Sequence, residues 1–309
     1  MLVTMKDILP QAKKGHYAVG LFNAVTLELA QGIIAAAEET GSPVIFGTAE
    51  VLLPYNSLDD LAMILIPMAT RAKVPVVVHL DHGLHKETCL KALKLGFSSI
   101  MYDCSTDTYE NNCIRVKEMT DIAHSYGASI EGEIGHVGGA EGAATAEQQS
   151  DAAKFYTTPE EAKDFVERTG VDALAIAVGT AHGAYKLPPK LDFERIQKIA
   201  HTVSTPLVLH GGSGLTDEDF RKCIEMGISK VNIFTDINIA AVSAALAHFT
   251  DMGKGIIDLL PSIREAIKVS VTEKMKLFGC CGKAGAAAGV PDEAMIRRIV
   301  EEVLRTRHA

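Results

Sequence analysis

Short apolar runs and longer amphipathic stretches alternate eight times along this chain. The run Val74–Leu80 is almost unbroken and rich in valine, which is typical of a strand covered on both faces of a parallel sheet. The stretch after it, Lys86–Leu95, has the apolar spacing of a helix. Eight such units in succession predict an α/β fold, the (β/α)8 TIM barrel, and a doubly wound parallel sheet is the alternative.

The boundaries of the units follow from the same pattern. Ser57, Thr158 and Thr216 each precede acidic residues, which is typical of a capped helix N-terminus. The expected strands are residues 17–22, 43–46, 74–80, 98–102, 128–134, 173–178, 206–209 and 230–234. The expected helices after them are residues 27–39, 58–72, 86–95, 109–125, 159–169, 193–201, 217–226 and 237–249.

Further helices are expected beyond the eighth unit. Pro261–Phe278 has the spacing of an amphipathic helix, residues 279–289 form a glycine-rich connector, and Asp292–Arg307 is predicted to be a charged terminal helix. We therefore expect one catalytic barrel domain at residues 1–283 and a helical tail at residues 284–309. The tail is expected to pack on the barrel or on a neighbour, and a homo-oligomer, dimer or tetramer, is predicted.

The charge and cysteine content narrow the class of protein. The net charge is −9 and no block of Lys or Arg is present, which argues against a nucleic acid or an anionic membrane as partner. No secretory signal pattern opens the chain, and its apolar windows are shorter than the roughly 20 residues of a membrane span. The six cysteines lack CxxC spacing, so free thiols are expected. These observations predict a cytoplasmic, enzyme-sized protein.

Polar side chains follow the predicted strands at the rim where barrel enzymes build their sites. Strands three to eight end in Asp81 and His82, in Asp103, in Glu133, in residues 180–183, in residues 210–214, and in Asn232 with Thr235 and Asp236. Three of these residues, His82, His182 and His210, come from different strands, and three imidazoles with an open position are the ligand set of a catalytic zinc. The sequence therefore predicts Zn²⁺ at this rim.

Side-chain alternation separates the neighbours on the third strand. His79 and Asp81 share the inward face, and we expect His79 to be a hydrogen-bonded interior residue rather than a ligand. Glu131 has the same expected status on the fifth strand. His82 would face outward in a regular strand, so we expect a turn at Gly83 that lets it reach the rim.

The glycine-rich turn after the seventh strand has the composition of a phosphate site. Gly211, Gly212 and Gly214 allow backbone N–H groups to approach an anion, and Ser213 adds a hydroxyl donor. The loops after strands seven and eight are the recurrent phosphate position of this barrel, so residues 232–235 are expected to complete the site.

The loop at residues 135–149 is long, small and polar, as expected of a mobile flap. On composition alone, its carboxylate Glu141 is expected to be solvated rather than catalytic.

With these residues assembled, the chain resembles the class II, zinc-dependent ketose-bisphosphate aldolases, the family of fructose-bisphosphate and tagatose-bisphosphate aldolases. The resemblance runs from about Ala18 to Lys283. It rests on five motifs that are highly specific together: VVVHLDHG from Val76, EGEIGHVGG from Glu131, GTAHGAY from Gly179, LVLHGGSG from Leu207 and KVNIFTD from Lys230.

The resemblance implies an aldolase that reversibly cleaves a ketose phosphate or bisphosphate to dihydroxyacetone phosphate and an aldehyde. It implies that His82, His182 and His210 bind zinc and that Asp81 is the acid/base at the substrate's C4 hydroxyl. It also implies that Glu141 takes the proton from dihydroxyacetone phosphate, which reverses the expectation from composition.

The resemblance assigns further binding residues. Asp103 and Glu133 match a second or alternative metal position. A monovalent cation, Na⁺ or K⁺, is often bound beside the dihydroxyacetone-phosphate site, which is matched by Gly183, Gly211, Gly212, Ser213, Asn232, Ile233, Phe234 and Thr235.

Two departures from the family pattern bear on the substrate. Phe234 stands where fructose-specific members commonly carry Asp, and Tyr102 and Cys104 flank Asp103 with unusual side chains. We therefore expect an altered aldehyde or sugar stereochemistry. The competing hypotheses are a metal-dependent hydrolase and a non-catalytic sugar-phosphate-binding protein on the same barrel, because the fold alone does not fix the chemistry.

Overall fold

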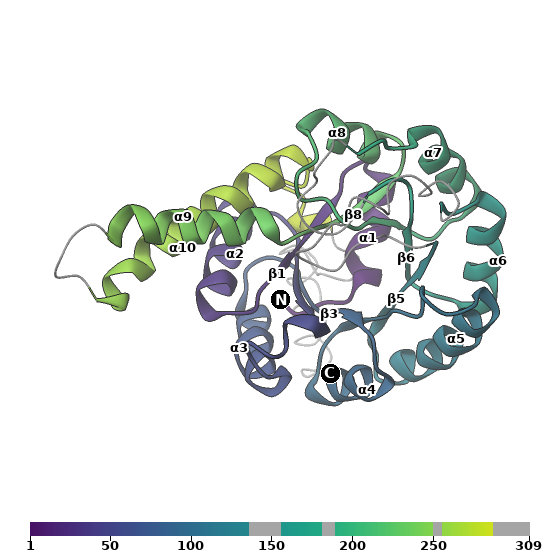
Figure 1. Cartoon of the computed structure of the whole chain (residues 1–309), viewed down its shortest axis with the longest axis horizontal. Coiled ribbons are helices and arrows are strands. Elements are labelled where there is room, and N and C mark those ends of the chain that lie inside the picture. Colours follow the sequence, from purple (N-terminus) through teal and green to yellow (C-terminus); the bar gives the residue numbers. More distant parts are fainter. Residues whose placement is uncertain (136–155, 181–188, 250–254, 287–309) are drawn as a thin grey trace, which may run out of the picture.

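Eight parallel strands close into a barrel around a buried core (Figure 1). The structure is a computed structural model and describes residues 1–135, 156–180, 189–249 and 255–286. The strands pair in chain order, and β8 pairs back with β1 through the partners Val19 and Lys230. The predicted (β/α)8 TIM barrel is confirmed, and the doubly wound sheet is excluded.

The predicted strand and helix boundaries differ from the observed ones by only a few residues. The strands are β1 (Val19–Asn23), β2 (Val44–Ala49), β3 (Val76–Gly83), β4 (Ser99–Tyr102), β5 (Ser129–Ile134), β6 (Ala173–Ile176), β7 (Leu207–Leu209) and β8 (Ile228–Ile233). The helices of the eight units are α2 (Leu27–Thr40), α3 (Leu58–Arg71), α4 (Lys86–Leu95), α5 (Tyr109–Ser125), α6 (Pro159–Thr169), α7 (Phe193–Thr202), α8 (Asp217–Glu225) and α9 (Thr235–Phe249). The predicted caps are confirmed, since the side chains of Ser57, Thr158 and Thr216 accept hydrogen bonds from the first turns of their helices.

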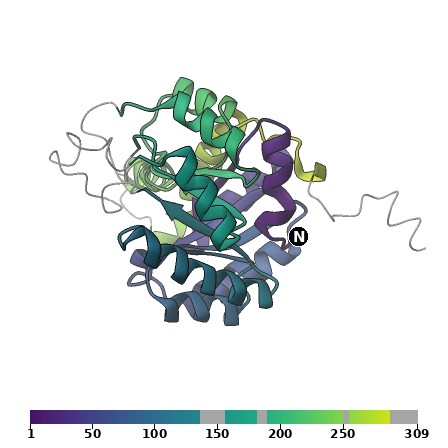
Figure 2. The same ribbon diagram turned by 90° about the vertical axis from the view of Figure 1, so that its right-hand side faces the viewer.

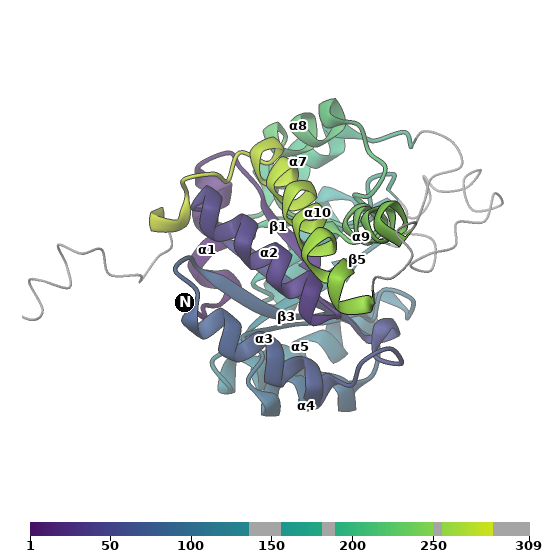
Figure 3. The ribbon, with the colours of Figure 1, turned by 90° about the vertical axis from the view of Figure 1, so that its left-hand side faces the viewer.

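A helix that the sequence analysis did not predict, α1 (Met5–Lys14), precedes the barrel. Figures 2 and 3 show α1 against the end of the barrel where the strands begin. Val3 N donates to Val76 O at 2.9 Å, and Met5 N donates to Ser129 Oγ at 3.0 Å, so the segment is joined to the starts of β3 and β5. Its buried residues have helical spacing and close this end: Met5, Ile8, Leu9 and Ala12.

At one side of the barrel, α9 and α10 (Ile256–Leu277) extend away as an arm (Figure 1). The helix predicted at residues 261–278 is confirmed and begins earlier. Near the barrel, α10 packs closely on α2, because a Cβ at Gly32 would lie 2.6 Å from Ile267 Cγ2. The arm exposes apolar side chains, namely Ile239, Val242, Leu246, Phe249, Ile256 and Ile257.

Several expectations stay predictions. The helix predicted at residues 292–307 lies outside the described residues, and the division into residues 1–283 and 284–309 and the homo-oligomer stay untested. Among the residues that the structure describes, no helix has both the length and the apolarity to cross a membrane.

Candidate metal and substrate site

Strand β3 delivers two neighbouring polar residues to the same end of the barrel. In a regular strand, Asp81 and His82 would point to opposite faces. The alternation breaks at His82, whose φ of 43° lies in the left-handed region, and the pairing with β4 shifts register between Leu80 and Gly83. Both side chains therefore reach the site, and both are buried, with 1% of Asp81 and 8% of His82 exposed.

The predicted turn at Gly83 is wrong in its position. Gly83 is a strand residue that pairs with Tyr102, and the left-handed backbone belongs to His82. Gly83 provides space instead, because a Cβ there would lie 2.6 Å from Cys89 Sγ. A left-handed backbone costs a non-glycine residue about 1–2 kcal/mol, so the contacts of the His82 ring must hold it in place.

The rings of His82 and His210 meet edge to face, with 78° between their planes. His82 Nε2 lies 2.8 Å from His210 Nδ1. The outer nitrogen of each ring contacts a carboxylate: His82 Nδ1 lies 2.8 Å from Asp103 Oδ2, and His210 Nε2 lies 2.7 Å from Glu131 Oε1. Carboxylates in these positions fix the ring orientations, so that the two inner nitrogens face one point, as in metal-bound histidines.

The surroundings determine the protonation of this histidine pair. Burial, together with the neighbouring positive charges, holds the pKa of His210 well below its usual value. Burial also lowers the pKa of His82, but the surrounding carboxylates outweigh it and raise that pKa to about 10; they belong to Asp81, Asp103 and Glu133. A protonated His82 therefore donates to the neutral His210. The space between the two inner nitrogens is a position where positive charge is stabilised.

The donor atoms at this position fit a divalent metal. Ligand atoms of Asp81, His82 and His210 lie within 4.8 Å of one another, and His82, Asp103 and Glu133 form a second such group. Imidazole ligands whose outer nitrogens bind carboxylates suit zinc. A metal ion would replace the proton that the carboxylates favour on His82, so the residues present are compatible with the predicted Zn²⁺.

Two side-chain amides hold Asp81 in place. Asn232 Nδ2 donates to Asp81 Oδ1 at 3.0 Å, and Asn23 Nδ2 donates to Asp81 Oδ2 at 3.4 Å. Asn23 is the last residue of β1, and Asn232 lies near the end of β8. Both amides donate to the carboxylate of Asp81, so they fix its orientation beside the histidine pair.

Asn23 and Lys230 are site residues that the sequence analysis missed. Lys230 is fully buried in β8, with Nζ 2.7 Å from Asn232 Oδ1 and 2.9 Å from Glu131 Oε2. A lysine inside a predicted barrel strand is the signal that could have identified it, because a buried ammonium requires partners. Asn23, as a polar residue at a strand end, carried the same signal as Asp103.

His79 and Glu131 are interior residues, as predicted. His79 Nδ1 lies 2.7 Å from Ser99 Oγ, and both His79 and Glu131 are fully buried. Burial and the charge of Lys230 hold the pKa of His79 well below its usual value. His79 is therefore a neutral imidazole in the barrel interior, while Glu131 contacts both His210 and Lys230.

The turn after β7 has a backbone suited to an anion. Gly211 and Gly214 have φ angles of 63° and 91°, and Gly212 lies so close to β8 that a Cβ there would be 3.0 Å from Asn232 O. Ser213 is buried in the same turn. The first turn of α8 is acidic, so we expect a phosphate at the glycine turn rather than at that helix end.

The predicted site residues within the described part of the chain gather at one end of the barrel. They come from β3, β4, β5, β7, β8 and the segments that follow these strands: Asp81, His82, Asp103, Glu133, His210, Gly211, Gly212, Ser213, Asn232, Ile233, Phe234 and Thr235. Glu141, His182 and Gly183 lie outside the described residues, and so does most of the predicted flap at residues 135–149.

Comparisons with known proteins show which family this chain belongs to. The family model for class II fructose-bisphosphate aldolase matches residues 3–283. The fructose-bisphosphate aldolase of Thermus caldophilus is 40% identical over 92% of this chain and 100% of its own length. The uncharacterized protein YdjI of Escherichia coli strain K12 is also 40% identical, over the same shares of the two chains.

Two solved structures of aldolases are also similar to this chain. The crystal structure of the YdjI aldolase from Escherichia coli K12 matches with a TM-score of 0.82 and 37% identity, and covers 92% of this chain and 100% of that chain. A putative fructose-1,6-bisphosphate aldolase from Coccidioides immitis matches with a TM-score of 0.81 and 31% identity, over 90% of this chain and 96% of that one.

Proposed function

Because the chain belongs to the class II fructose-bisphosphate aldolase family and is therefore a lyase, we propose that it is a zinc-dependent aldolase that reversibly cleaves a ketose phosphate to dihydroxyacetone phosphate and an aldehyde. One observation carries the proposal. The inner nitrogens of His82 and His210 meet at 2.8 Å, each ring is held from behind by a carboxylate, and Asp81 lies beside them.

We propose His82, His182 and His210 as the zinc ligands. Bound zinc would polarise the substrate's ketone and stabilise the enediolate. Asp103 would orient the His82 ring, and Glu131 would orient the His210 ring. Glu133 Oε2 lies 3.4 Å from His210 Nδ1, so Glu133 and Asp103 would offer an alternative metal position.

Two carboxylates would move the protons. Asp81, fixed by its two amide donors, would take the proton of the C4 hydroxyl when the carbon–carbon bond breaks, and would return it in the synthetic direction. Glu141 would exchange the proton at the reacting carbon of dihydroxyacetone phosphate. The two proton transfers would thus use different residues.

The phosphate of dihydroxyacetone phosphate would bind between the turn after β7 and the end of β8. The close approach of Gly212 to Asn232, and the positive φ of Gly211, support this position. Gly183, Ser213 and residues 233–235 would complete the site, with a monovalent cation, Na⁺ or K⁺, beside it.

Phe234 is proposed to alter the aldehyde or the sugar stereochemistry. It is partly buried against the core at the junction of β8 and α9, where it offers apolar bulk in place of a carboxylate. We therefore expect fructose 1,6-bisphosphate to be a poorer substrate than a stereoisomer such as tagatose 1,6-bisphosphate. A clear preference for the fructose compound would contradict this part of the proposal.

The function can be tested by measuring release of dihydroxyacetone phosphate from a panel of ketose mono- and bisphosphates, with metal analysis of the same sample. We expect turnover that stops with a chelator and returns with zinc. Asp81→Asn should retain zinc and lose cleavage. Release of inorganic phosphate without dihydroxyacetone phosphate would support a hydrolase instead, and tight binding without turnover would support a sugar-phosphate-binding protein.

A further inference from the structure

Lys230 has contacts that packing of the barrel does not require. It is fully buried near the centre of β8, and an ammonium group is costly to bury unless it is paired. Its Nζ lies 2.9 Å from Glu131 Oε2 and 2.7 Å from Asn232 Oδ1. An apolar residue would fill this space without the cost of desolvating a charge. The charge of Lys230 therefore indicates a role in the site.

The chemistry of Lys230 fixes the direction in which the Asn232 amide points. An ammonium can only donate hydrogen bonds, so it must face the carbonyl oxygen Oδ1 of Asn232. The amide nitrogen is thereby turned to the other side, where it donates to Asp81 at 3.0 Å. The two ends of an amide are nearly equal in shape, and a flipped amide would set its oxygen against the Asp81 carboxylate.

Glu131 links this arrangement to the histidine pair. Its Oε2 holds Lys230, and its Oε1 accepts the hydrogen bond from His210 Nε2. One buried carboxylate therefore orients both a proposed metal ligand and the lysine that orients Asn232.

We propose that Lys230 is a positioning residue for cleavage of the carbon–carbon bond: acting through Asn232, it holds the Asp81 carboxylate in the direction of the substrate hydroxyl. Lys230 itself does not touch the substrate. This inference rests on the proposed function, which gives Asp81 its role. Cleavage, which uses Asp81, should therefore depend on Lys230, whereas proton exchange at the carbon of dihydroxyacetone phosphate, which uses Glu141, should not.

Two variants test the role of Lys230. Lys230→Met keeps an unbranched side chain that is one heavy atom shorter and removes the donor, but it leaves Glu131 without its ion-pair partner and can destabilise the fold. The double variant Glu131→Gln with Lys230→Met removes both charges, and the glutamine still offers an acceptor to His210. The matched control is Lys268→Met, which removes an ammonium from an ion pair with Glu39, 2.6 Å away, on the outer helices.

For each protein, three quantities are measured: kcat and KM for cleavage, deuterium incorporation into dihydroxyacetone phosphate in the absence of aldehyde, and bound zinc. We expect kcat for cleavage to fall about 10- to 100-fold in folded Lys230→Met, with KM, zinc content and deuterium exchange near wild type, and the same fall in the double variant when it is saturated with zinc. The control should resemble wild type throughout.

Two results would overturn the inference while the proposed function stands. One is a folded, zinc-loaded double variant that cleaves at the wild-type rate. The other is an equal loss of cleavage and of exchange, since that would indicate a general structural role. A wild-type protein that cleaves no ketose phosphate would overturn the proposed function itself, and the inference with it.

Discussion

The two ends of the barrel contain different kinds of side chain. At and just below the end where the strands finish, a chain of contacts joins four buried ionisable groups: His82, His210, Glu131 and Lys230. Asp81 lies within 4.8 Å of the first two of them. At the end where the strands begin, α1 places apolar side chains such as Leu9 over the core.

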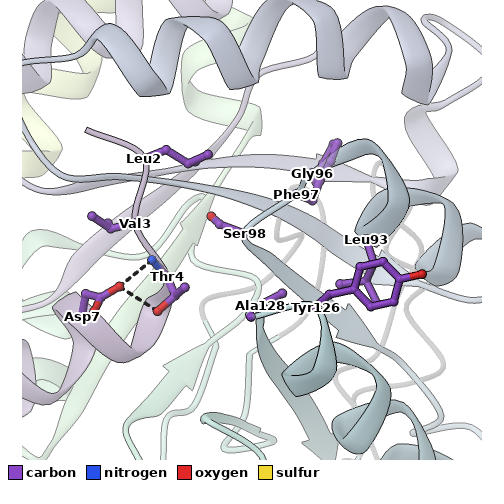
Figure 4. A pocket seen from close by; sticks show the side chains of 11 residues that line it. Leu2, Val3, Thr4, Asp7, Leu93, Gly96, Phe97, Ser98, Tyr126 and Ala128 are labelled. Carbon is purple, nitrogen blue, oxygen red and sulfur yellow. Dashed lines mark hydrogen bonds between the residues drawn. The ribbon is translucent and has the colours of Figure 1, made fainter.

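A cavity at the end of the barrel where the strands begin shows that a cavity alone does not make a functional site. It has a volume of about 410 Å³ and lies between α1, α4 and α5 (Figure 4). Its carboxylate, Asp7, is engaged at 2.8 Å by both the backbone N–H and the hydroxyl of Thr4, as the cap of α1. The remaining lining is apolar or neutral, including Leu93, Phe97 and Tyr126. The ends of one barrel are thus divided between chemistry and stability.

The largest expected effect comes from removing a histidine at the charged end. His210→Ala should abolish zinc binding and lower kcat for cleavage by at least about 1,000-fold, or roughly 4 kcal/mol in activation free energy, because both the metal and the orientation of His82 depend on it. Metal analysis, steady-state kinetics and a thermal unfolding curve check this. The control is His201→Ala on the exposed surface of α7. Zinc-dependent cleavage by His210→Ala within tenfold of wild type would contradict the site.

The matching change at the other end should affect stability alone. Leu9 is fully buried in α1, so Leu9→Ala should lower the free energy of unfolding by about 2–5 kcal/mol. The kcat and KM of the folded fraction should remain near wild type, because no polar group of the site is disturbed. Urea unfolding and kinetics on the same sample measure both, and Leu27→Ala, at an exposed position of α2, is the control. A fall in kcat at low urea would show that the two ends are coupled.

The sequence predicted the barrel because eight repeats of strand and helix periodicity leave few other topologies, and local signals such as the Thr158 cap set the boundaries. It missed α1, a ten-residue helix with Pro10 inside it that lies outside the repeat. It predicted that the His82 side chain reaches the rim, as the structure shows, but not the backbone conformation that places it there. A left-handed His82 is stabilised by contacts with Asp103 and His210, which come from other strands and leave no mark on the local sequence.

The ion pair of Lys230 could not be predicted from the local sequence either. Its position two residues before Asn232 shows that both side chains share a face, but its ion-pair partner Glu131 lies on β5. Only the closed barrel brings the two together. Periodicity therefore predicts which residues point inward, and the pairing among them depends on tertiary structure.

A smaller effect is expected in the pH dependence of metal binding. Carboxylates raise the pKa of His82 to about 10, so this imidazole is protonated in the metal-free protein at pH 8 and must lose its proton to bind zinc. Zinc affinity should therefore rise up to about tenfold per pH unit between pH 7 and pH 9, or roughly 1.4 kcal/mol. Calorimetry in two buffers of different ionisation enthalpy measures the released proton.

The variant Asp103→Asn tests the protonation of His82 more directly. It removes one of the carboxylates that stabilise protonated His82, so proton release on zinc binding should cease at a lower pH than in wild type. Zinc binding without proton release in the wild type at pH 7 would contradict the assigned protonation of the histidine pair.

The last prediction concerns the reactivity of the cysteines and leaves catalysis and stability unchanged; it measures whether both ends of the barrel are equally closed to solvent. Cys104 follows Asp103 at the charged end, and Cys280 lies two residues after Phe278, whose carbonyl accepts a hydrogen bond from Ala18 just before β1. Burial raises the pKa values of the two thiols to about 11 and about 12. Less thiolate is present at pH 8 when the pKa is raised, so both should react slowly with iodoacetamide. Cys281 is partly exposed and should react at least about 100-fold faster than Cys280. Peptide mass spectrometry measures both rates. In guanidinium, where the chain is unfolded, all cysteines should react alike. Fast labelling of Cys104 alone would show that the charged end opens more readily than the apolar end.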